Sequence, residues 1–157
     1  INSPTGSNCA KGVWFGDQDG AVSWPSGNAL KPGWGWQYRG WVRNKITNEY
    51  FTTGTFYRAD TVDSDWAGAC ADTLGTGYNL PGQDWDITGC TNFASMLDGN
   101  HEVFVTLEPE GRPANIAPFV LKLYYQNLIV TSVGCNRRDN MFTQRQNLPS
   151  INLRVTR

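Results

Sequence analysis

Charged residues are scarce in this sequence. They form 17% of the 157 residues, whereas an average soluble protein has about 25%. Thirteen basic and fourteen acidic side chains leave a formal net charge of −1, so the chain has no strong positive field that would attract nucleic acid or an anionic membrane surface. No apolar run approaches the roughly 18 residues of a membrane-spanning helix. We therefore expect neither a nucleic-acid partner nor membrane insertion.

Histidine and cysteine are also few. The sequence has one histidine and four cysteines, none of them in the C-x-x-C spacing that is typical of zinc sites. An even number of scattered cysteines is typical of disulfide-bonded exported proteins, so we expect two disulfides and no metal or other cofactor. Of the three possible pairings, we favour Cys70–Cys90 because the loop between them is short and rich in turn residues. Cys9 is then left to pair with Cys135.

The sequence lacks an Asn-x-Ser/Thr glycosylation acceptor as well. This absence favours a bacterial exported protein over a eukaryotic secretory one. The chain begins with Ile1 rather than methionine, so it has been either processed or shortened, and a signal peptide is the segment expected to be missing after processing. Together with the cysteines, this predicts a secreted or cell-surface location.

Long helical periodicity is missing. No window of about 12 residues keeps a 3.6-residue period, and seventeen glycines and eight prolines would interrupt most helices. Only residues 91–97 fit one or two helical turns. Apolar and polar residues instead alternate with a period of two, as in half-buried strands. This alternation predicts strands over 119–125, 151–156 and 34–38, the last resuming over 41–43 beyond a kink at Gly40. β-branched and aromatic residues predict further strands over 50–57, 103–107 and 128–133.

These strands are separated by turns, with no repeat, low-complexity tract or linker between them. We therefore predict a single all-β domain over residues 1–157, built as an antiparallel sandwich or a flattened barrel and stapled by the disulfides. The segment 119–125 alternates clearly, and its pattern would place Phe119, Leu121, Leu123 and Tyr125 together on one face.

Aromatic residues, by contrast, are abundant. They form 13% of the chain, and all seven tryptophans lie between Trp14 and Trp85. Segment 31–41 alternates large aromatic residues with glycines, which leaves the ring faces approachable. An indole face stacks against the C–H face of a pyranose ring, while neighbouring amides and carboxylates bind the hydroxyl groups. In loop 60–90, aspartates flank tryptophans directly.

These features predict a surface that binds a glycan or a glycoprotein receptor, formed mostly by the first 90 residues. Each residue also has a simpler interpretation, because tryptophans pack in cores and aspartates make turns. The candidate ligand-binding residues are Trp34, Trp36, Trp66 and Trp85 for stacking, and Asp63, Asp65, Asn79, Gln83, Asp84 and Asp86 for hydroxyl groups.

Signals for catalysis are weaker. His101 follows Asp98 by three residues but has no serine signature beside it, and we interpret it as a solvated loop residue. A glycosidase needs two carboxylates, normally from separate strands, so Glu102 with an aspartate of the preceding loop is a better pair than Glu108 with Glu110. The Asp-x-Asp pairs could chelate calcium, but the one that begins like a calcium loop lacks its downstream acidic ligand. We assign no catalytic residue and no metal ligand.

An exported all-β domain of this length, with disulfides, tryptophan-bearing loops and no catalytic signature, resembles the N-terminal receptor-binding (lectin) domain of chaperone–usher fimbrial tip adhesins. The resemblance is one of layout over the whole chain and includes the final strand 151–156. It implies an elongated immunoglobulin-like sandwich that binds host-surface glycans through loops at one end, at the tip of a fimbrium, with a pilin domain as the following partner. A carbohydrate-binding module of a larger secreted enzyme and a small secreted glycan hydrolase are the alternatives.

Overall fold

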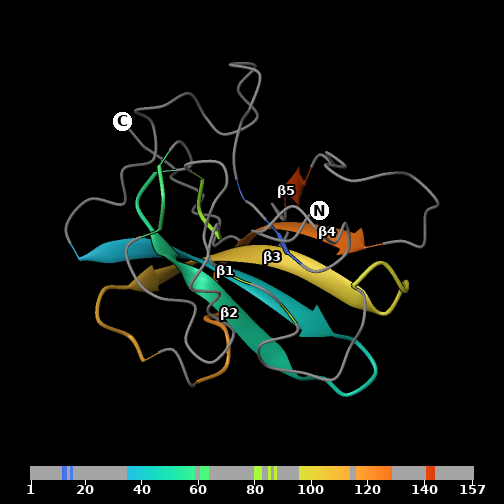
Figure 1. Ribbon diagram of the computed structural model, residues 1–157. Helices are drawn as coiled ribbons and strands as arrows, with labels where there is room; N and C mark the ends of the chain where they lie inside the picture. Colours follow the sequence, from blue (N-terminus) through green and yellow to red (C-terminus); the bar gives the residue numbers. More distant parts are fainter. Residues whose placement is uncertain are drawn as a thin grey trace, which may run out of the picture.

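The computed structural model describes residues 12, 13, 15, 35–58, 61–63, 80–82, 85, 87, 96–113, 116–128 and 141–143. Among these residues there is one antiparallel β-sheet and no helix (Figure 1). The strands found there are β1 (Trp36–Asn44), β2 (Tyr50–Phe56), β3 (His101–Pro109), β4 (Lys122–Leu128) and β5 (Phe142–Thr143). The prediction of an all-β, antiparallel structure is therefore confirmed for the described part of the chain.

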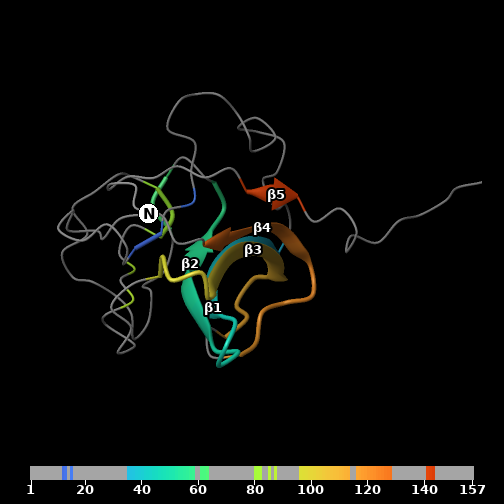
Figure 2. The same ribbon diagram turned by 90° about the vertical axis from the view of Figure 1, so that its right-hand side faces the viewer.

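The strand order is β2-β1-β3-β4-β5, and each neighbouring pair is antiparallel. β1 and β3 are paired along their whole lengths, from Trp36 opposite Pro109 to Asn44 opposite His101. Figure 2 shows that the sheet is strongly curved and that the connection between β3 and β4 passes across one of its faces. The other face is therefore the one available for the core.

The sandwich, its immunoglobulin-like form and the disulfides stay predictions. No second sheet occurs within the described ranges, and all four cysteines lie outside them. The predicted strand at 151–156 and residues 129–133 also lie outside the described ranges. The organisation of residues 1–157 as one domain therefore stays a prediction as well.

β1 continues through the predicted kink at Gly40, because its pairing with β3 is unbroken from Trp36 to Asn44. The irregularity at this point lies in the pairing of β1 with β2. Gly40 lies opposite Gly54, but the next residue, Trp41, lies opposite Thr52. Thr53 is therefore an extra residue in β2, which defines a β-bulge. A bulge increases the local twist, in keeping with the curvature of the sheet seen in Figure 2.

Gly40 allows two side chains to approach the backbone of β1 closely. A Cβ atom at position 40 would lie 2.2 Å from Oγ1 of Thr53 and 2.5 Å from Cε2 of Phe15. We expect Gly40→Ala to lower the free energy of unfolding by about 1–3 kcal/mol through overpacking, measured by urea denaturation. Adding Thr53→Ala should recover part of this loss because it removes the nearest atom. A cost that is the same with and without Thr53→Ala would contradict the steric explanation.

The pairing of β4 with β3 contains a second bulge. Tyr124 lies opposite Val105 but Lys122 lies opposite Thr106, so Leu123 is the extra residue. Leu123 and the neighbouring Tyr124 both pack against the core. The prediction that alternate residues of this segment share one face is wrong, because a period of two does not continue through a bulge.

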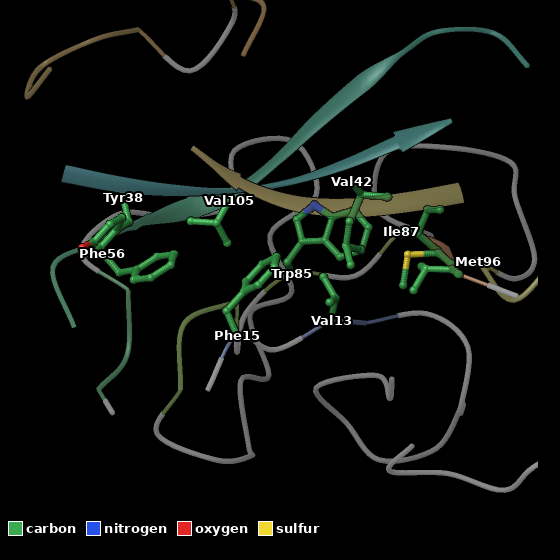
Figure 3. Close-up of a cluster of buried hydrophobic side chains, with 11 residues drawn as sticks. Val13, Phe15, Tyr38, Val42, Phe56, Trp85, Ile87, Met96 and Val105 are labelled. Carbon is green, nitrogen blue, oxygen red and sulfur yellow. The ribbon is translucent and has the colours of Figure 1, made fainter. Parts of the chain in front are cut away.

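The core covers one face of the sheet (Figure 3). The strands contribute Tyr38, Val42, Phe56, Val103 and Val105, and segments outside the sheet contribute Val13, Phe15, Trp85, Ile87 and Met96. Met96 is fully buried. It does not belong to a helix, and most of the predicted helical segment, residues 91–95, lies outside the described residues.

Candidate functional site

The charged residues of the strands lie on the face opposite the core. Successive side chains of a strand point to opposite sides, so the residues between the core positions form a second surface. We call it the polar face. It comprises Arg39, Trp41, Arg43, Tyr50, Thr52, Glu102, Phe104, Thr106, Glu108, Lys122, Tyr125 and Asn127.

One end of the polar face, around Glu108, is sealed from solvent. The side chains of Arg39 and Glu108 are 2% and 0% exposed, and Arg39 Nε lies 3.0 Å from Glu108 Oε2. The Thr106 hydroxyl donates to Glu108 Oε1 at 2.7 Å and accepts from the indole Nε1 of Trp41 at 2.9 Å. Buried charges are stable only when they are paired and hydrogen-bonded, and both charges here meet that condition.

The β3–β4 connection covers this sealed end (Figure 2). Arg39 Nη2 donates to the carbonyl of Arg112 at 2.7 Å, and the Arg112 guanidinium lies 3.3 Å from Glu108 Oε1. The Phe119 N–H donates to the same oxygen at 3.5 Å, and the Phe119 ring packs edge-on against Trp36. Glu108 thus ties the connection to the sheet and has no exposed surface to offer a ligand.

The other end of the polar face, beside the β1–β2 turn, is open. Arg43 Nη1 and Lys122 Nζ lie 3.1 Å and 3.5 Å from the same oxygen, Oε1 of Glu102. Arg43 Nε and the Tyr50 hydroxyl both donate to Oδ1 of Asn48, at 2.9 Å and 3.3 Å. The Arg43 and Lys122 side chains are 30% and 24% exposed, and Tyr50 is 37% exposed. We call these five residues the open cluster.

The β1–β2 turn places Asn48 in the open cluster. The φ angle of Asn48 is 60°, in the left-handed region that asparagine adopts more readily than most residues. The Asn44 side chain accepts hydrogen bonds from the N–H groups of Ile46 and Thr47, and the Asn44 N–H donates to the carbonyl of Glu49. These local hydrogen bonds close the turn.

The buried ring of Phe104 packs against the side chains of the open cluster. Phe104 is fully buried, stacks on Trp41 with ring centroids 6.4 Å apart, and meets Tyr50 edge-on at 6.2 Å. Lys122 Nζ lies 3.9 Å from the Phe104 ring centroid, and the Arg43 guanidinium lies 5.5 Å from that of Tyr50. Such cation–π contacts hold the cationic groups in place, so a ligand would meet groups that are already ordered.

The two glutamates of the polar face are far apart. Glu102 and Glu108 point to the same side of β3 but are separated by six residues, which is about 20 Å along a strand. The two carboxyl groups of a glycosidase lie about 5–10 Å apart. Each glutamate is also paired with an arginine of β1. They therefore do not form a glycosidase pair with each other.

His101 is buried in β3 rather than solvated in a loop. Its prediction as a loop residue is wrong because β3 begins at this position and pairs it with Asn44 and Leu128 on the two flanking strands. Its Nδ1 lies 2.8 Å from Oδ1 of Asp98. Burial alone would raise the pKa of Asp98, but the hydrogen bonds with His101 and the Asn100 N–H outweigh it and hold the pKa below its usual range.

Three of the predicted ligand-binding residues lie in the described part of the chain. Trp36 is partly buried at the start of β1. Trp85 is fully buried in the core, so the stacking role predicted for it does not fit its position, because no ring face is available to a sugar. The buried carboxylate of Asp63 accepts a hydrogen bond from the Gly82 N–H at 2.8 Å and fixes the chain there. The other candidates lie outside the described residues: Trp34, Trp66, Asp65, Asn79, Gln83, Asp84 and Asp86.

Sequence reasoning missed the open cluster. The available signal was a charged residue next to an apolar one at a strand position, as Arg43 follows Val42 and Glu102 precedes Val103. That signal indicates which residues share a face of one strand, but it does not show which strands are neighbours. Only the pairing of β1 with β3 places Arg43 opposite Glu102.

Within the described ranges, no three histidine, cysteine, aspartate or glutamate side chains gather as a metal site requires. No helix in that part of the chain has the length and apolar character needed to cross a membrane. Comparison with known proteins found no family model, no curated protein and no solved structure that matches the chain.

Proposed function

We propose that this protein is an extracellular carbohydrate-binding domain, a lectin or adhesin without catalytic activity, and that the open cluster is its ligand site. The observation that carries the proposal is a half-exposed tyrosine ring held among charged and amide groups. Tyr50 bonds to Asn48 and lies under the guanidinium of Arg43. An aromatic ring with a few placed polar groups is the usual composition of a sugar site.

The chemistry of the cluster suits neighbouring hydroxyl groups. A sugar hydroxyl both donates and accepts a hydrogen bond, whereas a carboxylate only accepts and arginine and lysine only donate. Adjacent hydroxyls of one ring would bridge Glu102 and a cation, with the C–H face of the ring against Tyr50. One such platform gives weak affinity, which several copies at a surface raise through avidity.

In this proposal the chain acts outside the cell or at its surface, as the receptor-binding part of an adhesin of the fimbrial type, with a pilin domain as a further partner. A carbohydrate-binding module of a secreted enzyme would use the same cluster. Glu102 and Glu108, about 20 Å apart, do not act on one glycosidic bond, and a hydrolase would have to use Glu102 with an aspartate of loop 60–90 instead.

A glycan array with the protein displayed multivalently tests the proposal. We expect a defined set of glycans to bind, and Tyr50→Ala to weaken binding of the best one about tenfold, equivalent to about 1.4 kcal/mol, because the stacking surface is lost. Tyr57→Ala is the matched control, since Tyr57 is also half-exposed, at 41%, but lies outside the cluster. The Tyr57→Ala variant should bind this glycan with the same affinity as the wild-type protein.

Two results would contradict the proposal. A blank array for the wild-type protein would remove the evidence for a glycan ligand. Equal losses of affinity in Tyr50→Ala and Tyr57→Ala, with unchanged melting temperatures, would place the ligand elsewhere than in the open cluster.

A further inference from the structure

Hydrogen-bond donors outnumber acceptors at the open cluster. Arg43 uses Nε and Nη1 for contacts within the cluster, and Nη2 makes no hydrogen bond or ion pair within the described part of the chain. Lys122 donates to Glu102, and Lys45, in the adjoining turn, donates to Asn127. Each ammonium group has three N–H donors, so several donors at this place are left for a ligand.

Positive charge also exceeds negative charge here. Arg43 and Lys122 are paired with Glu102, and Lys45 donates to Asn127, the residue opposite Glu102 on β4. The turn also carries Glu49, which accepts a hydrogen bond from the Thr47 hydroxyl at 2.7 Å, so three cationic side chains stand against two carboxylates. The cluster is thus locally cationic, although the whole chain has a net charge of −1.

From these two observations we propose that the open cluster recognises a glycan that carries an anionic group, either a carboxylate or a sulfate. The inference rests on the proposed function and names the class of sugar. The anionic oxygens accept hydrogen bonds from Arg43 Nη2 and from the ammonium group of Lys122, and such charge-assisted bonds are about twice as strong as neutral ones. The uncharged part of the sugar stacks on Tyr50.

The geometry keeps the two cations ordered for this role. Arg43 is held between Asn48 and Glu102, at 2.9 Å and 3.1 Å, and Lys122 is held over the ring of Phe104. Single-stranded nucleic acid is also anionic, but it requires a groove of cations that follows its backbone. The described polar face offers no such groove, because its far end is covered by the β3–β4 connection.

The test compares three matched glycan sets at equal display density: neutral oligosaccharides, the same backbones bearing a uronic acid, and the same backbones bearing a sulfate. We expect the wild-type protein to bind at least one acidic set about tenfold more tightly than the neutral set. The preference should shrink at about 0.5 M salt, because exposed charges are then screened. The two acidic sets distinguish a carboxylate from a sulfate as the recognised group.

Variants locate the anion site. Arg43→Gln should weaken binding of the preferred acidic glycan about 10- to 100-fold and binding of its neutral counterpart by a clearly smaller factor, because the hydrogen bond to a neutral hydroxyl is not charge-assisted at the ligand. Glu102→Gln keeps an oxygen that accepts from a hydroxyl group but removes the opposing charge, so it should strengthen acidic-glycan binding about threefold. Arg58→Gln, at an exposed arginine outside the cluster, is the control and should change neither affinity. Melting temperatures verify that each variant is folded.

The outcomes separate this inference from the proposed function. Equal binding of neutral and acidic sets would overturn the inference and leave the proposed function standing. If the protein binds none of the glycan sets, both the inference and the proposed function are overturned. If it then binds a single-stranded oligonucleotide, the cluster is assigned to nucleic acid instead. Unchanged acidic-glycan affinity in Arg43→Gln would overturn the inference by placing the anion site elsewhere.

Discussion

Replacing Glu108 by alanine is expected to lower the free energy of unfolding by about 3–5 kcal/mol. The carboxylate is fully buried and is paired with Arg39 and Arg112. Its removal leaves the buried guanidinium of Arg39 without a counter-charge, and it releases the β3–β4 connection from the sheet. Chemical denaturation followed by tryptophan fluorescence measures the loss.

Glu102→Ala is the control for this prediction. Glu102 lies on the same face of the same strand and is also paired with an arginine, but its partner Arg43 is 30% exposed. The Glu102 side chain is 11% exposed, so this pair is partly buried, and its loss should lower the free energy of unfolding by less than the loss of the fully buried Glu108 pair. Similar losses at both glutamates would contradict the view that burial decides the energy of these pairs.

A double variant tests the cause of the Glu108→Ala effect. Arg39→Met combined with Glu108→Leu replaces both buried charges by apolar side chains of similar volume, and such replacements are often neutral or stabilising. The double variant should therefore be more stable than Glu108→Ala alone. If it is less stable, the hydrogen bonds to Thr106 and the connection, rather than the unpaired charge, dominate.

Trp85→Ala is also expected to lower the free energy of unfolding by about 3–5 kcal/mol. The indole is fully buried and lies in the core beside Phe15 and Val42 (Figure 3), so its removal leaves a large cavity under the sheet. Urea denaturation gives the value. Trp85→Phe should cost less, because most of the ring volume is kept and the indole Nε1 has no hydrogen-bond partner within the described residues.

Glycan binding by Trp85→Phe distinguishes packing from recognition at this position. A folded Trp85→Phe variant should bind glycans as the wild type does, since Trp85 offers no exposed ring face. Weaker binding at unchanged melting temperature would restore Trp85 as a stacking residue.

The strands were predictable where their signal is local. β2 and β3 were expected because their segments are rich in the β-branched and aromatic residues that favour strands. The bulge at Leu123 was not predicted, because it depends on the registry between β4 and β3. A sequence pattern describes one strand and says nothing about the residue opposite.

The candidate site was less predictable than the fold. Arg43 and Lys122 meet at Glu102 only because β1 and β4 flank β3 on its two sides. The sequence of a single segment does not determine the order of the strands in the sheet. The abundance of tryptophan led to the prediction that residues such as Trp85 stack on a sugar, but the structure places Trp85 in the core. The half-exposed ring of the open cluster is instead a tyrosine that follows a turn.

The division of β3 into a sealed and an open half bears on how this protein can diverge. Around Glu108 a substitution threatens the fold, whereas around Glu102 the partner cations are 30% and 24% exposed and their ion pairs should contribute less to stability. In the proposed function, changes at Arg43, Tyr50 and Lys122 would therefore alter recognition with a smaller effect on stability than changes at Glu108. A lineage could then exchange one proposed ligand for another by drift at these positions, while the sealed half kept the sheet folded.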